Sequence, residues 1–381
     1  MRVVSLAPFR IADPDSGGRR LIFDGARQWA ATCESFQCFA LITLRDRRHG
    51  PVPFPYQEFR AGSSLWLVFD RLGWLPKVPY LRSMRRHAPR LARAALRSRP
   101  DLVEVHGPWL ASVRRRLPDT VRVVLVMQNV ETAWYEPYVR ARPWAGRFRR
   151  LLARMEAEAM AEADHIVCLT ELDRRALMRL YRIPSGKIHV IPPGFHPPAH
   201  PPPANSGESR QVIFVSSGFH DGAASARRLI DVVAPRLDPG LELVVAGSVC
   251  GQLRASGLPA GVRLAGYVPD LDGLIGRCRA MLNADQSCAG INMKVLAGLG
   301  AGIPVISTPE GARGYEDLVG GPIRVGALDA FPAMIRCATP LSGADRAAIQ
   351  RYAWPVIGAR RAALYEQWLQ SPAGSESSTA R

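Results

Sequence analysis

Three short segments in the first half of the chain carry residues that could bind an anionic or polyhydroxylated ligand. Gly17 and Gly18 follow the first strand-like segment, and glycines at such a turn let backbone N–H groups approach a ligand closely. His106 ends the apolar segment DLVEVH, where its imidazole could orient a hydroxyl group or accept its proton. Asn129 and Glu131 follow another strand and could bond a polyhydroxylated ligand. A surface turn, a capping histidine and a polar loop end would explain the same residues, so both interpretations stay open at this point.

Two small-residue loops follow predicted strands in the second half. Ser217 and Gly218 come after the segment QVIFV, and Tyr267 and Val268 come after GVRLAG. In an open α/β sheet, ligands bind beyond the carboxyl ends of the strands. We therefore include these four residues among the candidates for a ligand site, although ordinary turns use the same residue types.

The longest candidate stretch is AGINMKVLAGLGAGIPVIST, residues 289–308. Gly290, Ile291 and Asn292 precede a predicted helix, so their amides are free to face an incoming anion. Lys294 lies in the first turn of that helix and could add a positive charge beside a diphosphate. Close packing of a helix on a sheet would also explain the small residues, and an ordinary solvated position would explain Lys294.

The elements that must position these loops alternate along the whole chain. We predict strands at residues 2–8, 39–44, 101–105, 121–127, 165–170, 187–191, 211–217, 241–247, 261–266, 280–285, 303–308 and 322–326. Helix patterns lie between them, and the clearest cover residues 144–163 and 171–181, the second opened by Thr170 and Asp173 as a capping box. Short apolar strands separated by helices indicate parallel sheets covered on both faces. The pattern occurs twice and predicts two doubly wound α/β domains of the Rossmann type.

A proline-rich segment divides the chain. We expect an N-terminal domain at residues 1–190, a stiff linker at 191–209, a C-terminal domain at 210–342, a terminal helix at 343–369 that packs back toward the N-terminal domain, and a disordered tail at 370–381. Because proline breaks a helix interior, we expect Pro355 to interrupt the terminal helix.

The 381 residues carry a formal net charge of +17, and the excess lies in the first half. Residues 1–195 contain 33 Lys and Arg against 18 Asp and Glu, whereas the rest of the chain contains 17 against 15. Arginines form two clusters there, at residues 82–99 and 140–150. A basic half is typical of a protein that contacts nucleic acid, anionic lipid or an acidic substrate. No recognised nucleic-acid-binding motif accompanies the charge, so we expect an anionic membrane surface and no nucleic acid as a partner.

Cysteine usage and hydropathy predict the cellular compartment. The seven cysteines are odd in number and include no CxxC pair, which favours reduced thiols over disulfides or a metal cluster. The N-terminus shows no signal-peptide pattern, and no stretch of 18 uncharged apolar residues occurs. We therefore expect a cytoplasmic protein that is peripheral on the inner face of the cytoplasmic membrane.

Taken in order, the segments VHGPW, NVE, EAEAMAEADHIVCLTELDRRAL, VIPPGF, FVSSGF, LVVAGS, GYVPDL and GINMKVLAGLGAGIPVISTPEGARG resemble family 4 glycosyltransferases of the two-domain GT-B fold. The closest-looking branch has the form G-x-N-x-K-x-L in this last segment. The resemblance spans about residues 1–330 and implies two Rossmann-like domains that face a central cleft. It also implies a retaining transfer, without metal or cofactor, from a nucleotide-sugar to a lipid-linked, saccharide or small-molecule hydroxyl acceptor. Such a transfer would serve bacterial synthesis of a polysaccharide, for example of the cell envelope, of a glycolipid or of a glycosylated metabolite.

The same resemblance assigns roles to the candidate residues. It places the donor against Gly17, Gly18, Ser217, Gly218, Tyr267, Val268, Gly290, Ile291, Asn292 and Lys294, with His106 at the reacting centre and Asn129 and Glu131 on the acceptor side. Amides that line a diphosphate would stabilise the leaving nucleotide while an oxocarbenium-like centre develops.

Three positions depart from the family pattern. The family has two glutamates around the donor loop, the first at the sugar and the second at the ribose, where this chain has Ala289 and Ala297. Gln128 stands where relatives have histidine before asparagine. Loss of a ribose acceptor could cost about 1–3 kcal/mol of donor binding. An alternative is therefore a catalytically impaired GT-B module that acts as the partner of an active transferase.

Overall fold

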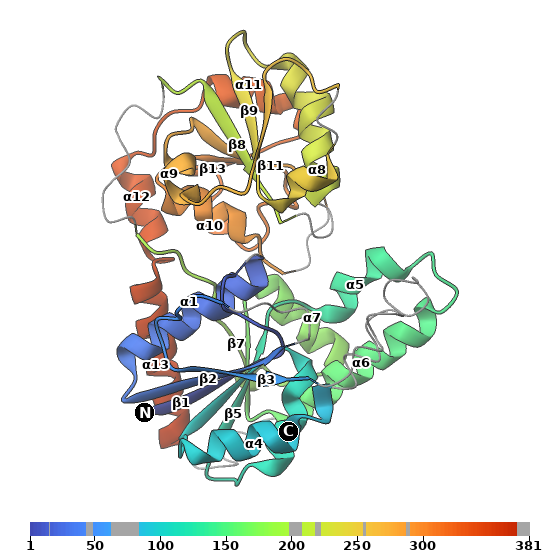
Figure 1. Ribbon diagram of the computed structural model, residues 1–381, viewed down its shortest axis with the longest axis vertical. Coiled ribbons are helices and arrows are strands. Elements are labelled where there is room, and N and C mark those ends of the chain that lie inside the picture. Colours follow the sequence, from blue (N-terminus) through green and yellow to red (C-terminus); the bar gives the residue numbers. More distant parts are fainter. Residues whose placement is uncertain are drawn as a thin grey trace. The chain divides into compact units, whose positions relative to one another are not determined.

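The protein is described here by a computed structural model that covers residues 1–14, 16–42, 49–61, 84–197, 208–217, 222–253, 257–286 and 290–371. Its internal contacts divide the chain into two compact units, one formed by Met1–Pro192 with Ile357–Arg381 and the other by Pro193–Val356. Each unit contains one parallel sheet with helices on both sides (Figure 1). Two doubly wound α/β domains of the Rossmann type are thus confirmed, while the cleft expected between them stays a prediction.

The sheet of the first unit has the strand order β3-β2-β1-β4-β5-β6-β7, and every pair is parallel. Its strands are β1 (Arg2–Ala7), β2 (Ser35–Ile42), β3 (Tyr56–Arg60), β4 (Leu102–His106), β5 (Arg122–Met127), β6 (His165–Cys168) and β7 (Ile188–Val190). We did not predict β3, because its sequence YQEFR is polar and only Phe59 of it is buried. An edge strand is hydrogen-bonded on one side only and does not need a continuous apolar sequence.

Helices cover both faces of this sheet. They are α1 (Gly17–Thr32), α4 (Ala88–Arg97), α5 (Glu131–Val139), α6 (Ala145–Glu162), α7 (Glu171–Tyr181) and α13 (Trp354–Gln370). Leucines, valines and methionines of α4, α6 and alternate strand positions form one large buried cluster. On the opposite face, Trp29 of α1 and Tyr365 of α13 are buried with ring centroids 5.3 Å apart. The predicted cap of α7 is present, since Thr170 accepts a hydrogen bond from the Asp173 amide at 2.9 Å.

The second unit repeats the design with the order β10-β9-β8-β11-β12-β13. Its strands are β8 (Gln211–Val215), β9 (Glu242–Ala246), β10 (Val262–Gly266), β11 (Ala280–Asn283), β12 (Val305–Ser307) and β13 (Ile323–Val325). Its helices are α8 (Gly222–Arg228), α9 (Leu271–Gly276), α10 (Met293–Gly300), α11 (Phe331–Arg336) and α12 (Gly343–Gln350). One buried cluster holds α9, α10 and α12 against the sheet, and a second holds α8 and α11 against its other face.

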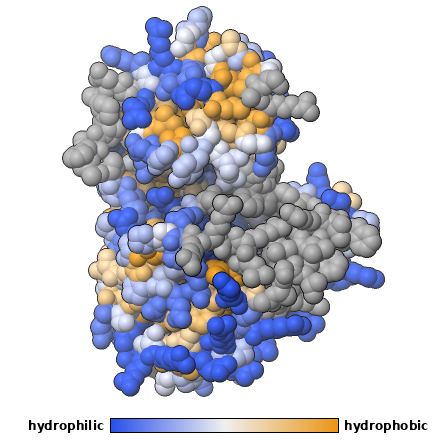
Figure 2. Space-filling model, in the orientation of Figure 1, coloured by the Kyte–Doolittle hydropathy of each residue, from blue (hydrophilic) through white to orange (hydrophobic). Residues whose placement is uncertain are grey.

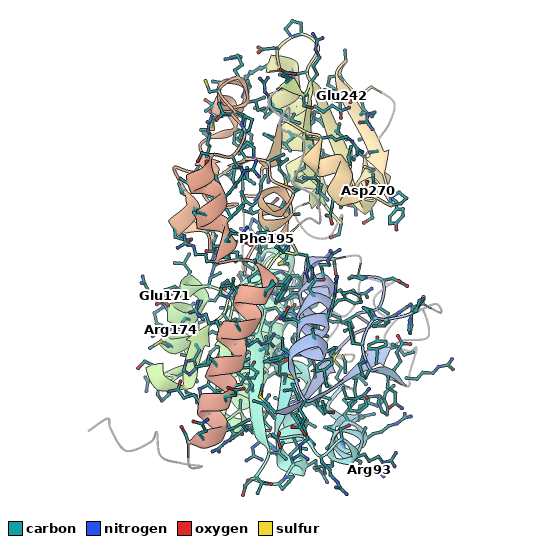
Figure 3. All side chains as sticks on the ribbon, turned by 90° about the vertical axis from the view of Figure 1, so that its left-hand side faces the viewer. Arg93, Glu171, Arg174, Phe195, Glu242 and Asp270 are labelled. Atoms are coloured by element: carbon teal, nitrogen blue, oxygen red, sulfur yellow. The ribbon has the colours of Figure 1, made fainter. Side chains whose placement is uncertain are left out.

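The C-terminal segment differs from the expected single helix. Residues 351–353 separate α12 from α13, and Pro355 is the second residue of α13 rather than its interruption. Proline fits the first turn of a helix because the amide it lacks has no partner there in any case. From Ile357 onward α13 belongs to the first unit, whereas α12 belongs to the second. Figure 3 shows α13 lying along the strands of the first unit. Nearly all of the predicted tail lies outside the described residues.

Candidate functional site

The carboxyl ends of β1, β4 and β5 bring the first-half candidates to one edge of their sheet. The strand order reverses direction between β1 and β4, which are neighbours in the sheet, and this is the place where open α/β sheets bind ligands. Gly17 and Gly18 open α1 after β1, His106 is the last residue of β4, and Glu131 opens α5 after β5. The sequence therefore identified the segments of this edge.

The glycine loop and the loop after β5 touch each other. The Gln128 side-chain amide approaches the Gly18 carbonyl oxygen at 3.4 Å. A Cβ atom on Gly18 would lie 2.7 Å from the Gln128 side-chain oxygen, so an alanine there would make the Gln128 side chain shift. Gln128, which departs from the family pattern described in the sequence, thus packs against the glycine loop.

His106 lies under this edge with its ring buried. Its Nε2 atom is 3.0 Å from the Ser5 hydroxyl, and its Nδ1 atom has no hydrogen-bond partner among the described residues. Burial, together with the Arg361 guanidinium, lowers the pKa of His106 to about 3. The imidazole is therefore neutral at pH 7 and can orient a hydroxyl group without carrying a charge.

A buried glutamate, Glu104, connects β4 to α1 and α13. Its Oε1 atom accepts hydrogen bonds from the Trp29 indole at 3.0 Å and the Tyr365 hydroxyl at 2.8 Å, and it forms an ion pair with Arg361. The His106 Nε2 atom lies 3.8 Å from the other carboxylate oxygen. Sequence reasoning missed this cluster, because its members stand at opposite ends of the chain.

The acceptor-side candidate Glu131 is buried beside a second carboxylate, Glu156 of α6. Glu156 accepts hydrogen bonds from the Glu131 amide at 2.7 Å, the Thr132 amide at 3.2 Å and the Tyr181 hydroxyl at 2.5 Å. Burial and the neighbouring Glu156 raise the pKa of Glu131 to about 8, although a hydrogen bond from Asn129 acts in the opposite direction. Glu156 therefore replaces the missing side-chain cap of α5 and holds the loop that carries Asn129.

In the second unit the strand order reverses between β8 and β11. Ser217 follows β8, and its carbonyl oxygen accepts a hydrogen bond from the Ser248 hydroxyl at 2.7 Å. Gly247 has φ +101°, and a Cβ atom there would lie 2.2 Å from the Ser216 carbonyl oxygen. The backbones after β8 and β9 are thus packed directly against each other. Gly218 lies outside the described residues.

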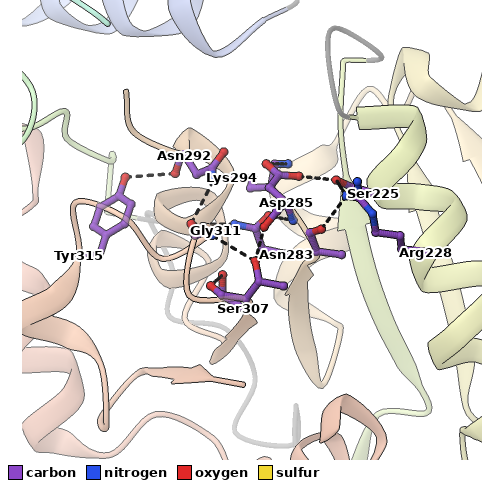
Figure 4. A network of polar contacts seen from close by, with 11 residues as sticks. Ser225, Arg228, Asn283, Asp285, Asn292, Lys294, Ser307, Gly311 and Tyr315 are labelled. Atoms are coloured by element: carbon purple, nitrogen blue, oxygen red, sulfur yellow. Dashed lines mark hydrogen bonds and ion pairs between the residues drawn. The ribbon is translucent and has the colours of Figure 1, made fainter. Parts of the chain in front are cut away.

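The donor-loop candidates lie where β11 leads into α10 (Figure 4). Gly290 has φ +88°, a conformation that other residues rarely adopt, and Asn292 is the residue before the first turn of α10. The Asn292 side chain donates to the Gly311 carbonyl oxygen at 3.0 Å, while its own carbonyl oxygen accepts from the Tyr315 hydroxyl at 3.1 Å. The Asn292 side chain and backbone carbonyl therefore both fix this loop to the segment that contains Gly311 and Tyr315.

Lys294 does not point to solvent as an unpaired charge. Its ammonium group lies 2.8 Å from the Asp285 carboxylate and 4.9 Å from the centre of the Phe214 ring. Asp285 also accepts a hydrogen bond from the Ser225 hydroxyl at 2.7 Å (Figure 4). Both partners are largely buried. The predicted role beside a diphosphate must therefore be shared with the ion pair to Asp285.

Tyr267 and Val268 follow β10 in different environments. Tyr267 is 87% exposed, whereas Val268 packs against the apolar cluster that includes α10. The loop is thus anchored by Val268 and presents the Tyr267 ring to solvent. In the same unit Ala297 is half-buried on α10, and Ala289 lies outside the described residues.

Two further features concern the described part of the chain. None of its helices combines the length and apolar character that a membrane span needs. No group of three or more His, Cys, Asp or Glu side chains there is close enough together to hold a metal ion.

Two family comparisons cover most of the sequence. Residues 44–197 match the model described as Glycosyltransferase Family 4, and residues 209–331 match the one described as Glycosyl transferases group 1. The boundary between the two matches falls close to the boundary between the two α/β units. The chain belongs to the glycosyltransferases, with a family 4 N-terminal part and a group 1 C-terminal part.

Solved structures agree with this fold over nearly the whole chain. Sucrose-phosphate synthase from Thermosynechococcus elongatus is 14% identical, with a TM-score of 0.71 over 97% of this chain and 99% of that chain. Anabaena HepE in complex with UDP-glucose is 14% identical, with a TM-score of 0.65 over 96% and 100%. The lipopolysaccharide outer core galactosyltransferase WaaB is 14% identical, with a TM-score of 0.62 over 96% and 100%. A search of the curated proteins finds no relative by sequence.

Proposed function

We propose that the protein transfers a sugar from a nucleotide-sugar to a hydroxyl acceptor. The observation that carries this proposal is the loop from Gly290 to Asn292, which precedes α10 at the strand-order reversal of the second sheet. The carboxyl ends of strands at such a reversal, together with the first amides of a helix, suit a diphosphate. HepE, which shares the fold, has been crystallised with UDP-glucose, so a uridine nucleotide is the first donor to test.

In this mechanism the chain's own groups act by electrostatics and position. The amides of the Gly290 loop would take up charge on the leaving diphosphate, and Ser217 with Gly218 would face the same phosphates. The neutral His106 would orient the sugar or acceptor hydroxyl at the reacting centre. We further propose retention of anomeric configuration and no requirement for a metal ion or cofactor, as the family resemblance implies. A transfer assay with and without a chelator tests the last point.

The acceptor side is proposed to be the edge that carries Asn129 and Glu131 in the first unit. A lipid-linked saccharide is our first choice of acceptor, because WaaB, which has the same fold, acts on the lipopolysaccharide core. Such an acceptor would place the protein in the cytoplasm, on the inner face of the membrane, with the basic first unit toward anionic lipid.

The decisive experiment compares Gly290→Ala with Gly320→Ala. Both glycines have a positive φ, +88° and +89°, so an alanine at either costs a similar ~1–2 kcal/mol of backbone strain. Gly320 precedes β13 and belongs to no candidate loop. Calorimetry with UDP and UDP-glucose should show binding that is kept by Gly320→Ala and lost, or weakened at least ~10-fold, in Gly290→Ala. Equal affinity in the two variants would contradict the proposed donor site.

A second candidate function is favoured by Ala297, which stands half-exposed on α10 where the family has a ribose-binding glutamate. An impaired module would bind no nucleotide-sugar and would raise the activity of a partner transferase instead. A thermal-shift panel of nucleotides and nucleotide-sugars separates the two functions. If no ligand in the panel raises the unfolding temperature, the impaired module is the better description.

A further inference from the structure

The hairpin formed by α5 and α6 carries an unusual density of positive charge at its end. Between Val139 and Met155 the sequence contains six arginines and no acidic residue. They are Arg140, Arg142, Arg147, Arg149, Arg150 and Arg154, and all are exposed. In Figure 1 α5 and α6 extend to one side of their unit, and hydrophilic residues rim that side in Figure 2.

Four of these arginines have no acidic partner in the described part of the chain. Arg149 pairs with Glu136 at 3.0 Å and Arg154 with Glu158 at 2.8 Å. No such pair exists there for the remaining four, which we call the hairpin tip: Arg140, Arg142, Arg147 and Arg150. Unpaired exposed charges on one short segment repel one another. Binding of an external anion would reduce this repulsion and would therefore be favourable.

The hairpin is built to hold this tip rigidly. Phe148 and Leu152 of α6 are buried in the main core of the unit, and Tyr135 of α5 packs edge-on against Phe148 at 5.3 Å. Arg147, Arg150 and Arg154 share the opposite face of α6, since they are three and four residues apart. Arg147 and Arg150 therefore project from the exposed face of α6, and Arg140 and Arg142 lie in the connection that precedes it.

An aromatic side chain stands among the charges. Trp144, the residue before α6, is half-exposed, and its ring packs edge-on against Phe148 at 6.0 Å. Tryptophan and arginine are the side chains that suit the boundary between water and lipid, because each has an apolar body and a polar end. No recognised nucleic-acid-binding motif accompanies these charges, which favours an anionic bilayer over nucleic acid as the partner.

We propose that the hairpin tip is the surface through which this protein binds an anionic phospholipid bilayer. The inference rests on the proposed membrane location and assigns that location to one of two arginine clusters. The other cluster, on and around α4, includes Arg86, Arg93 and Arg97, which are also exposed, and exposed Arg116 ends the segment Pro108–Arg116 that packs on α4. Figure 3 labels Arg93 on α4.

The test compares two quadruple variants of the full chain that lose the same charge. The tip variant carries R140Q, R142Q, R147Q and R150Q, and the control carries R86Q, R93Q, R97Q and R116Q. Co-sedimentation uses phosphatidylcholine vesicles with or without phosphatidylglycerol. Since a surface arginine contributes up to about fivefold to such binding, the tip variant should bind the anionic vesicles at least ~10-fold more weakly, and the control should bind like the wild type. Unfolding temperatures that match the wild type establish that both variants are folded.

Each other outcome overturns the proposal. Equal binding by the tip variant and the wild type, or an equal loss in the control, assigns membrane contact to another surface and leaves the membrane location itself intact. If wild-type binding does not depend on phosphatidylglycerol, both the proposed role of the hairpin tip and the proposed membrane location are wrong. Binding of UDP-glucose tests the transferase function separately. A wild type that binds duplex DNA but no vesicle assigns the tip to nucleic acid.

Discussion

The Lys294 ammonium on α10 lies 2.8 Å from the Asp285 carboxylate at the carboxyl end of β11. The pair joins the first turn of the donor-loop helix to the strand that precedes the loop. The sequence predicted that the Lys294 charge faces a diphosphate, whereas the structure pairs this charge with Asp285. The pair therefore controls both the stability of the second unit and the charge that a donor would meet.

Removal of one partner of this pair should destabilise the second unit. Lys294→Met leaves the buried Asp285 carboxylate with the Ser225 hydroxyl as its remaining side-chain partner among the described residues, and we expect a loss of about 2–4 kcal/mol in the free energy of unfolding. The double variant Asp285→Asn with Lys294→Met should lose less than the sum of the single losses, by at least ~1 kcal/mol in a urea-unfolding cycle. Additive losses would mean that the two groups do not interact in solution.

Ionisation of Glu131 should lower the free energy of unfolding as the pH rises. Its pKa is raised to about 8 in the folded protein by burial and by Glu156, so the folded state holds a proton that the unfolded state releases near pH 4.5. The free energy of unfolding therefore decreases as pH rises from about 4.5 to about 8. Glu131→Gln lacks this decrease and should be more stable than the wild type at pH 9 by at least ~1 kcal/mol, with little difference at pH 4.

Urea titrations of both proteins across that range measure the effect. Parallel pH profiles for the wild type and Glu131→Gln would show that this carboxyl group is ionised and solvated. Glu156→Asp serves as the matched control, because it retains the second charge and shortens its reach to the α5 amides.

Protonation of His165 should lower the free energy of unfolding as the pH falls. Its ring is stacked on Trp368 of α13, with centroids 4.0 Å apart, and burial followed by the neighbouring His189 lowers its pKa to about 4. Because the unfolded imidazole takes up its proton near pH 6.5, the free energy of unfolding decreases as pH falls from about 6.5 to about 4. Below pH 4 the imidazole is protonated in both states and adds no further loss.

His165→Phe keeps an aromatic ring against Trp368 and removes the titration. Thermal unfolding at pH 7 and pH 4.5 should show a smaller drop for this variant than for the wild type. A drop of the same size in both proteins would assign the acid sensitivity to other groups, of which His106 is the first to examine, because its pKa is also lowered.

Removal of one charge of the buried Glu104–Arg361 ion pair should destabilise the protein strongly, whereas removal of both charges should destabilise it less. Glu104→Gln leaves the buried Arg361 guanidinium without a counter-charge, and we expect about 3–5 kcal/mol of destabilisation. Glu104→Gln combined with Arg361→Met removes both charges and should recover at least half of that loss. Urea unfolding of the two variants gives the comparison, and equal losses would show that the charges do not stabilise each other.

Local sequence was sufficient to predict the elements with strong patterns. Each of the twelve strand segments that we predicted overlaps a strand, and the helix predicted at residues 171–181 has those bounds with Thr170 as its cap. Apolar runs and capping residues act over a few neighbours along the chain, so their signal survives in the sequence alone. The strand β3 lacked such a signal, because an edge strand can be polar.

The sequence by itself determined that this chain forms two parallel α/β sheets and which loops lie at their carboxyl edges. The reason is that the alternation of apolar strands and helices can be recognised along the sequence without knowledge of any distant contact. Only the tertiary structure decided the electrostatic state of those edges. Glu104 meets Arg361 from the far end of the chain, Glu156 caps a helix that it does not belong to, and Asp285 neutralises Lys294. Such pairs depend on burial and on distances between residues remote in sequence, and these quantities exist only once the chain has folded.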